Sequence, residues 1–324
     1  MAGQVPPLIF GEALVDAFPN ALIPGGAPFN VACHLAALGL QPLLLSRIGA
    51  DAGGARLRAA ATRCGLRLDG IQHEDVLGTA RVLVHERADG HAFEIPADLA
   101  FDHIEAAGAL AAVDAALAAT PAGWLYHGTL ALRSEVSRAA LAAVRGSRPF
   151  RVFVDLNWRE AGPTPAQILS LLHDIEVLKL SEAELSLLLG WLQLPAPSEA
   201  RPEVGAGHPS LAALAERTGA RWILVTHGGD GAALWSADGQ CRASVAAPVA
   251  SCLVDTVGAG DAFSARMLAA LLRGQPAGQA LAAAVAFASA SVGWRGAVPE
   301  DLSVYDGLLP PAAAPPSPHP SAAP

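Results

Sequence analysis

One short segment of the sequence combines groups that bind an anion with a group that accepts a proton. It reads Asp255-Thr256-Val257-Gly258-Ala259-Gly260-Asp261 and stands between an apolar run at 250–254 and a predicted helix at 261–272. Glycines before a helix let backbone N–H groups converge on an anion, and the helix dipole adds positive potential. A carboxylate repels an anion, so Asp261 fits such a loop as a base that deprotonates a hydroxyl attacking phosphorus. The alternative is that Asp261 only complements the helix dipole.

A second glycine cluster lies near the N-terminus and reads Gly25-Gly26-Ala27-Pro28-Phe29-Asn30. Paired glycines let a ligand approach the backbone, and Pro28 suits the first position of a helix. Asn30, inside that helix, offers a donor and an acceptor to a sugar hydroxyl. Asp16, at the end of the first predicted strand, can accept two hydroxyls. The alternative is a tight turn with a surface Asn and a strand-end Asp.

Other classes of protein lack their signatures here. No G-x-x-x-x-G-K-[ST] motif occurs, and Phe263 replaces the third glycine of the dinucleotide fingerprint, which argues against P-loop enzymes and nicotinamide oxidoreductases. The histidines and cysteines show no zinc spacing, so the four cysteines, Cys252 included, are expected to be reduced and buried. A net charge of -9 disfavours nucleic acid as a partner, and no apolar stretch is long enough to predict a membrane span. Because no signal peptide is evident, a cytoplasmic location is expected.

The elements that must position these residues alternate between short apolar runs and Ala/Leu-rich helical stretches. This pattern predicts an α/β fold with a doubly wound, mostly parallel sheet and helices on both faces. The composition, 52% hydrophobic and 16% charged, is sufficient for a large core. The predicted strands are 8–15, 42–48, 123–127, 151–155, 176–180 and 221–226, and the predicted helices are 29–38, 53–64, 102–119, 134–145, 182–189, 210–217, 261–272 and 277–292.

A hairpin interrupts this alternation. Residues 79–86 and 91–95 alternate apolar and polar side chains on either side of Asp89-Gly90, which is a hairpin signal. Strands with one wet face do not suit a buried parallel sheet, so we expect a small β lid, or an antiparallel sheet edge. A lid with an exposed apolar face needs cover, which predicts a homodimer joined partly through the lids. The expected organisation is one domain at 1–308, with a lid from about 12–24 and 78–98, and a Pro/Ala-rich disordered tail at 309–324.

The two glycine regions together resemble the signature regions of the PfkB (ribokinase-like) family of carbohydrate kinases. Three segments between them strengthen the resemblance: Asp155-Leu156-Asn157-Trp158-Arg159 is similar to a D-x-N-x-R segment, Thr226-His227-Gly228-Gly229-Asp230-Gly231 to a T-x-G-x-x-G nucleotide loop, and Lys179-Leu180-Ser181-Glu182-Ala183-Glu184 to the K-x-S-x-x-E stretch of the fructokinase-like branch. The resemblance covers about residues 5–305. Five segments in register are far more specific than any one of them.

The resemblance implies a role for each matching residue. It implies that Asp261 is the catalytic base and that Gly258, Ala259 and Gly260 form the anion hole. The residues implied to bind the sugar are Asp16, Gly25, Gly26, Asn30, Asn157 and Arg159. Those implied to bind the nucleotide are Lys179, Ser181, Glu184, Thr226, Gly228 and Gly231. It also implies ATP and Mg2+, with Glu184 orienting magnesium-bound waters, and K+ at Asp255.

The resemblance implies an ATP-dependent sugar kinase with D-fructose as substrate. Many relatives carry Asn where this chain has Ser181, which reduces the direct contribution of this position to metal binding. Relatives that act on ketodeoxy acids carry a Tyr-Arg pair in the lid, whereas this chain has Glu94-Ile95-Pro96 without a cation, which favours a neutral sugar. The alternatives are a 2-keto-3-deoxygluconate, ribose or nucleoside kinase of the same family, and a catalytically silent sugar-binding regulator.

Overall fold

The central layer of the molecule is a nine-stranded sheet in the order β13-β12-β11-β10-β9-β8-β1-β4-β5. The computed structural model describes residues 5–18, 21–87, 90–117, 123–195, 202–250, 252–306 and 308. Neighbouring strands from β11 to β5 are parallel, and β12 and β13 add an antiparallel edge. The strands are β1 (Leu8–Phe10), β4 (Leu43–Gly49), β5 (Ile71–Glu74), β8 (Trp124–His127), β9 (Arg151–Asp155), β10 (Val177–Ser181), β11 (Trp222–Thr226), β12 (Ala232–Ser236) and β13 (Cys241–Val245).

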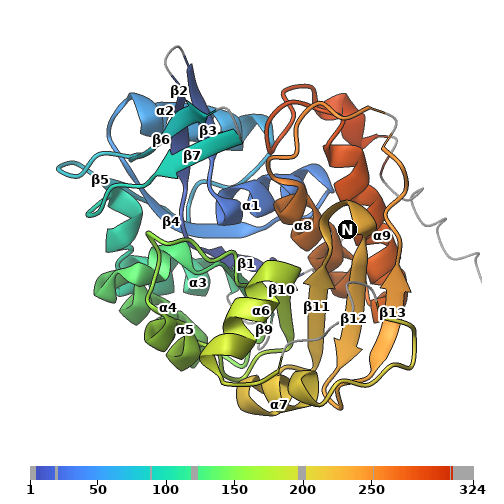
Figure 1. Ribbon diagram of the computed structural model, residues 1–324. Helices are drawn as coiled ribbons and strands as arrows, with labels where there is room; N and C mark the ends of the chain where they lie inside the picture. The colour runs from blue at the N-terminus through green and yellow to red at the C-terminus, as the bar shows by residue number, and fades with distance from the viewer. Residues whose placement is uncertain are drawn as a thin grey trace, which may run out of the picture.

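Helices cover both faces of this sheet (Figure 1). The apolar side chains on one face pack against α1, α2, α8 and α9, and those on the other face pack against α3 to α7. These helices are α1 (Ala27–Ala37), α2 (Ala52–Arg63), α3 (Ala106–Leu117), α4 (Glu135–Ser147), α5 (Pro165–Leu171), α6 (Glu182–Trp191), α7 (Pro209–Thr218), α8 (Ala259–Leu272) and α9 (Ala277–Ser291). The predicted doubly wound fold is therefore confirmed.

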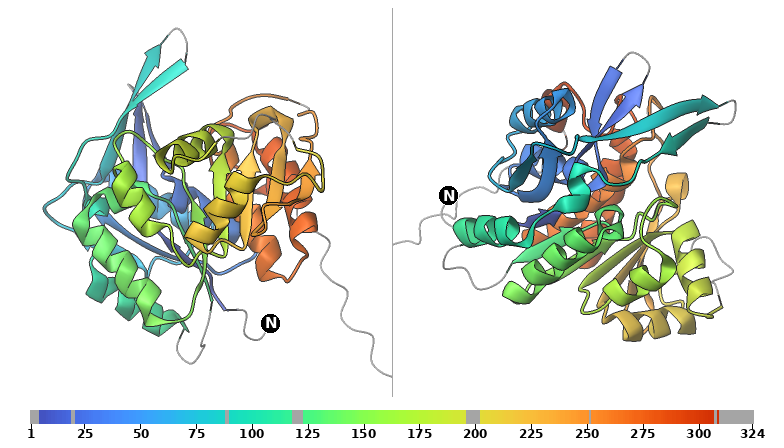
Figure 2. Two further views of the ribbon diagram at one scale, coloured as in Figure 1. Left: turned by 60° about the horizontal axis from the view of Figure 1, so that its bottom comes forward. Right: turned by 90° about the vertical axis from the view of Figure 1, so that its left-hand side faces the viewer.

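A separate four-stranded sheet, in the order β3-β2-β6-β7, projects from the body (Figure 2). Its strands are β2 (Leu14–Phe18), β3 (Ala21–Gly25), β6 (Ala80–Arg87) and β7 (Gly90–Glu94). The hairpin predicted at 79–95 is β6 and β7, paired antiparallel outside the main layer. Only β2 and β6 are paired in parallel within the described part of this sheet.

The single strand predicted at 8–15 is wrong, because the chain changes sheet within it. β1 ends at Phe10, Gly11 follows with a φ of +145°, and β2 begins at Leu14 in the small sheet. A Cβ on Gly11 would lie 2.6 Å from Cγ of Pro28, so the bend requires glycine. This bend leads the chain from the end of a central strand into the small sheet.

Other differences from the sequence prediction have local causes. The predicted helix at 102–119 is divided, because Asp102 caps a short 3-10 turn (Ala100–His103) by accepting from the N–H of Leu99 at 3.0 Å, and α3 begins only at Ala106. Four elements were not predicted from the sequence: the short strands β5, β12 and β13 and the seven-residue α5. Each has too few residues to show a clear periodicity. The apolar run at 250–254, to which no element was assigned from the sequence, forms no helix or strand in its described residues, and Leu253 and Val254 are exposed.

The cysteine prediction holds for three of the four residues. Cys33, Cys64 and Cys241 are buried, whereas Cys252 is exposed, because it lies in the loop before the anion-binding segment rather than in a strand or helix. All four are free thiols. Within the described ranges, no helix combines the length and the apolar character that crossing a bilayer requires. The tail predicted at 309–324 lies outside the described residues.

Candidate active site

The glycine loop before α8 has the conformation that the sequence predicts for an anion site. Gly258 has a φ of +78°, and a Cβ there would lie 2.3 Å from Cβ of Ala297, so only glycine fits. The N–H of Ala262 starts the helix by donating to the Gly258 carbonyl at 2.8 Å. The N–H of Ala259 donates to the carbonyl of Thr256 at 3.3 Å. Ala259 and Gly260 line a large pocket. The positive end of the α8 dipole therefore faces a space for a ligand.

The two glycine regions meet through one hydrogen bond. Asn30 on α1 donates from Nδ2 to Oδ2 of Asp261, in the first turn of α8, at 2.8 Å. The two residues are 231 positions apart, and helices α1 and α8 pack against each other. Oδ1 of Asn30 is buried and has no protein partner, which leaves an acceptor for a hydroxyl beside the carboxylate.

Burial raises the pKa of Asp261 from 3.8 to about 7. The hydrogen bond from Asn30 and the positive charges of Lys179 and Arg159 lower this pKa, and the negative charge of Asp155 raises it further. A general base is most effective when its pKa lies close to the working pH. The surroundings of Asp261 therefore suit it to accept a proton near neutral pH.

This pKa predicts an acidic limb in the pH profile. As pH falls through about 7, Asp261 takes up a proton and can no longer accept one from a substrate. We expect kcat/KM to fall roughly tenfold per pH unit below that value and to level off above it. Initial rates measured from pH 5.5 to 8.5 at subsaturating substrate check this, and a flat profile would contradict it.

Asp16, Gly25 and Gly26 lie together outside the lining of the large pocket. Asp16 lies on β2, and a Cβ on Gly25 would lie 3.0 Å from its Oδ2, so the bare backbone packs beside the carboxylate. Gly26 has a φ of +101°, and a Cβ there would lie 2.7 Å from the carbonyl oxygen of Glu12. Burial raises the pKa of Asp16 to about 6. These residues, predicted from the sequence to bind the sugar, lie together at the junction of α1 and the small sheet.

Glu12 is a buried acid beside Gly26 to which no role was assigned from the sequence. Its Oε2 has no protein partner, and its pKa is raised to about 7, first by burial and then by the charge of Asp261. Arg159 lowers that pKa, as it does for Asp261, so this arginine lies within electrostatic reach of both acids. The sequence signal that points to Glu12 as a candidate site residue is its position, two residues after the first central strand.

The loop that carries Asn157 and Arg159 is held by Glu184. The N–H of Trp158 donates to Oε1 of Glu184 at 2.8 Å, while Oε2 accepts from the N–H of Ser181 at 2.7 Å in the capping box of α6. Asn157 adopts a φ of +37° at the turn after β9. Each carboxylate oxygen has a second lone pair, so Glu184 fits a water-mediated contact to Mg2+.

Lys179 lies below the anion loop and does not line the large pocket. Its Nζ donates to both oxygens of Asp155, at 2.9 and 3.1 Å, and both side chains are buried. A Cβ on Gly260 would lie 3.3 Å from this Nζ, which places the ammonium directly beside the loop. Lys179, expected from the resemblance to bind the nucleotide, therefore lies beside Gly260 of the anion loop.

The large pocket has a volume of about 630 Å3 and lies against the anion loop. Thr226, Gly228 and Gly231, predicted from the nucleotide loop, line one side of it. Gly231 has a φ of +109°, and a Cβ there would lie 2.0 Å from the Val245 carbonyl, so this turn requires glycine. The rest of the wall, absent from the sequence analysis, comes from small and apolar residues of α9 and the loop before α8: Val285, Ala288, Ser289, Val292, Ala247, Pro248, Val249, Ala250 and Leu253. This size and largely apolar lining suit a nucleotide.

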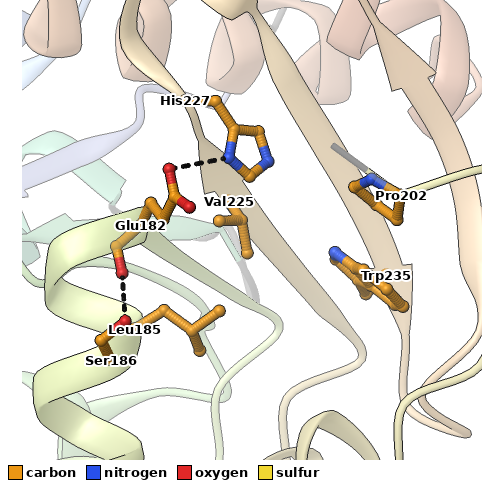
Figure 3. A pocket seen from close by; sticks show the side chains of 7 residues that line it. All are labelled: Glu182, Leu185, Ser186, Pro202, Val225, His227 and Trp235. Carbon is orange, nitrogen blue, oxygen red and sulfur yellow. Dashed lines mark hydrogen bonds and ion pairs between the residues drawn. The ribbon is translucent and has the colours of Figure 1, made fainter. Parts of the chain in front are cut away.

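A second, much smaller cavity lies behind the nucleotide loop (Figure 3). Its volume is about 30 Å3, too small for a sugar or a nucleotide. The ring of His227 points into it and faces Glu182 on α6, with 3.5 Å between Nδ1 and Oε2. His227 thus lines the small cavity, while its neighbours Thr226 and Gly228 line the large pocket.

Asp255 braces the other end of the anion loop. Its Oδ1 accepts from the N–H of Val257 at 3.0 Å, and its Oδ2 accepts from the N–H of Gly296 at 2.9 Å. Among the residues that the structure describes, no cluster of three or more His, Cys, Asp or Glu side chains is placed to hold a metal ion. In the structure, the carboxylate of Asp255 joins the anion loop to the turn after α9.

The doubly wound sheet with a small projecting sheet is the fold of an α/β sugar kinase, as the comparisons with known proteins show. The family model described as pfkB family carbohydrate kinase matches residues 10–302, and the chain belongs to that family. It is 31% identical over 283 residues to a fructokinase of Salmonella typhimurium, covering 81% of this chain and 83% of that protein. The protein is therefore an ATP-dependent sugar kinase.

Solved structures show the same fold. A fructokinase with bound ATP from Xylella fastidiosa superposes with a TM-score of 0.75 at 23% identity, covering 94% of this chain and 98% of that one. A fructokinase double mutant from Vibrio cholerae O395, in fructose, ADP and potassium ion bound form, superposes with a TM-score of 0.74 at 24% identity, covering 95% of this chain and all of that one (100%).

Proposed function

We propose that this sugar kinase transfers the γ-phosphoryl group of ATP to D-fructose. The observation that carries the proposal is the bond of 2.8 Å from Asn30 to Asp261, which joins the helix after the first glycine cluster to the helix after the anion loop. The anion loop and the nucleotide loop line the pocket of about 630 Å3, and Asp16, Gly25 and Gly26 lie together outside that lining. A base in this place can deprotonate a sugar hydroxyl while the hydroxyl attacks the terminal phosphorus.

Different residues of the chain bind the sugar, accept its proton and stabilise the phosphoryl group. Asp16 and Asn30 hold the sugar hydroxyls, with Asn157 and Arg159 where the sugar meets the phosphate. Asp261 accepts the proton of the attacking hydroxyl, and the N–H groups of Gly258 and Gly260 stabilise the charge that develops on the phosphoryl oxygens, with the N–H of Ala259 joining them where it exchanges the Thr256 carbonyl for a phosphoryl oxygen. Closure of the small sheet over the sugar excludes water, so transfer outcompetes hydrolysis.

The charged side chains beside the nucleotide fit the expected ions. Glu184 would hold Mg2+ through water, since both of its oxygens already accept backbone N–H groups. The metal ion, when bound, neutralises charge on the ATP phosphates. Ser181 serves as a helix cap in the structure, which is consistent with an indirect rather than a direct role toward the metal. Asp255 and the Val257 carbonyl would flank K+, an ion bound by the V. cholerae fructokinase.

The choice of D-fructose is tested by a panel of sugars with ATP and Mg2+. The fructokinase relative and the lack of a cation in Glu94-Ile95-Pro96 both favour a neutral ketohexose. We expect the highest kcat/KM for D-fructose among D-fructose, D-ribose, 2-keto-3-deoxygluconate and a nucleoside. A buried, unpaired carboxylate on the substrate costs a few kcal/mol. If 2-keto-3-deoxygluconate were the best substrate, the fructose proposal would fail, and Arg159 would be the residue to test as its clamp.

The small sheet also carries the proposal of a homodimer. Its order leaves β3 and β7 as edge strands, and an edge needs to be covered or blunted. A second copy of the chain, pairing its small sheet with this one, would cover them. Sedimentation velocity at micromolar concentration is expected to show a dimer, and a monomer at working concentrations would remove the proposal.

A further inference from the structure

A buried ion pair lies directly under the anion loop. Asp155 at the end of β9 accepts two hydrogen bonds from Nζ of Lys179 on β10, one from Oγ of Ser264 at 2.8 Å and one from the hydroxyl of Tyr126 at 3.3 Å. Asp155 and Ser264 have no exposed surface, and Lys179 is 6% exposed. The network thus connects two central strands and β8 to α8 one turn after Asp261.

Structural stability alone does not account for this pair. Replacing a buried ion pair by apolar residues of similar volume is often neutral or stabilising, because both charges lose their hydration. Three side chains donate four hydrogen bonds to one carboxylate, which fixes the position of the ammonium group. A rigidly held charge next to a catalytic loop indicates a role in the chemistry.

Lys179 has a hydrogen-bond donor to spare. An ammonium carries three N–H groups, and two of them are directed at Asp155. The same Nζ would lie 3.3 Å from a Cβ on Gly260, a residue that is itself exposed and lines the nucleotide pocket. The absence of a side chain at position 260 thus leaves the ammonium next to the space where the phosphates of the nucleotide would lie.

We propose that Lys179 is a catalytic residue that donates its third N–H to the phosphoryl group in flight, and that Asp155 is the positioning residue that holds it there. This inference rests on the proposed function. In the step, the sugar oxygen bonds to the γ-phosphorus as its proton passes to Asp261. The bond from phosphorus to the bridging oxygen breaks, and its electron pair leaves with ADP. Lys179 remains protonated throughout and supplies only a hydrogen bond and its charge.

Single variants of the pair test the inference through opposite changes in the pH profile. Lys179→Met is expected to lower kcat by about 10²–10³, the usual loss for one donor to a transition-state oxyanion, with the KM values changed less than about threefold. It removes a positive charge that lowers the pKa of Asp261, so the acidic limb moves to higher pH. Asp155→Asn removes a negative charge that raises this pKa, so the limb moves to lower pH. Arg159 and Glu12, the other charged groups near Asp261, are unchanged in both variants.

A double variant separates chemistry from folding. Lys179→Met with Asp155→Asn removes both charges and keeps an acceptor for Ser264 and Tyr126, so we expect a folded protein whatever the single variants do. We expect its kcat to stay at least about 10²-fold below wild type. Arg47→Met is the matched control, because it breaks an ion pair with Glu74 between β4 and β5, at the edge of the sheet and away from the central β9 and β10. It is expected to lower Tm without moving kcat or the acidic limb.

The outcomes are distinguishable from failure of the proposed function. A double variant that is folded and keeps more than about a tenth of wild-type kcat overturns the role of Lys179, and so does a pair of single variants with unchanged acidic limbs. In either case the wild type would still phosphorylate its sugar. A wild type inactive toward every sugar in the panel would instead overturn the proposed function and this inference with it.

Discussion

Asp261→Asn is expected to lower kcat by about 10²–10⁴, the usual contribution of a general base. Asn is nearly isosteric with Asp and keeps an oxygen that can accept from Nδ2 of Asn30, as Oδ2 of Asp261 does at 2.8 Å. It also suits the start of a helix, so Tm should stay within about two degrees. The variant cannot take up a proton from the sugar hydroxyl. Steady-state kinetics and thermal unfolding on the same preparation measure both quantities.

Gly258→Ala is the contrasting control for Asp261→Asn. Its Cβ would lie 2.3 Å from Cβ of Ala297, and the φ of +78° is strained for alanine, so stability and turnover should fall together. The two variants thus separate loss of the base from distortion of the loop. If Asp261→Asn kept more than about a tenth of wild-type kcat, Asp261 would not be the base and the assigned mechanism would be wrong.

Ala288→Trp should raise the KM for ATP by about 10²-fold while leaving the KM for the sugar unchanged. Ala288 is on the face of α9 that lines the large pocket, where an indole would occupy the space of the nucleotide base. A ligand gains about 0.3 kcal/mol per non-hydrogen atom. Expelling about ten atoms of a base therefore costs roughly 3 kcal/mol, or about 10²-fold in affinity.

Ala286→Trp is the matched control on the same helix. Ala286 is exposed and does not line the pocket, so the same indole placed there should leave both KM values near those of the wild type. Titration with ATP at saturating sugar distinguishes the two variants. Equal KM values for ATP in both would show that the nucleotide binds elsewhere.

The sequence by itself determined the parts of the protein that depend on local backbone conformation. Gly26, Gly231 and Gly258 adopt positive φ values that disfavour any other residue, so their spacing marks the ligand loops before any fold is known. Most central strands are confirmed within one residue of their predicted bounds, because a strand buried on both faces is an uninterrupted apolar run. Sequence patterns of this kind also carry the resemblance to the sugar kinase family, since each motif is a short, contiguous segment.

Only the tertiary structure decided which of these segments act on one another. The partner of Asp261 is Asn30, 231 positions away, and the partner of Lys179 is Asp155 on the adjacent strand, a pairing that the sequence motifs do not indicate. The apolar run at 250–254 shows the same limit, since nothing in its sequence indicates that Leu253 is exposed and lines the pocket. Burial and long-range contacts set pKa values and hydrogen-bond partners, and these depend on how α1, α8 and the sheet pack rather than on the order of residues.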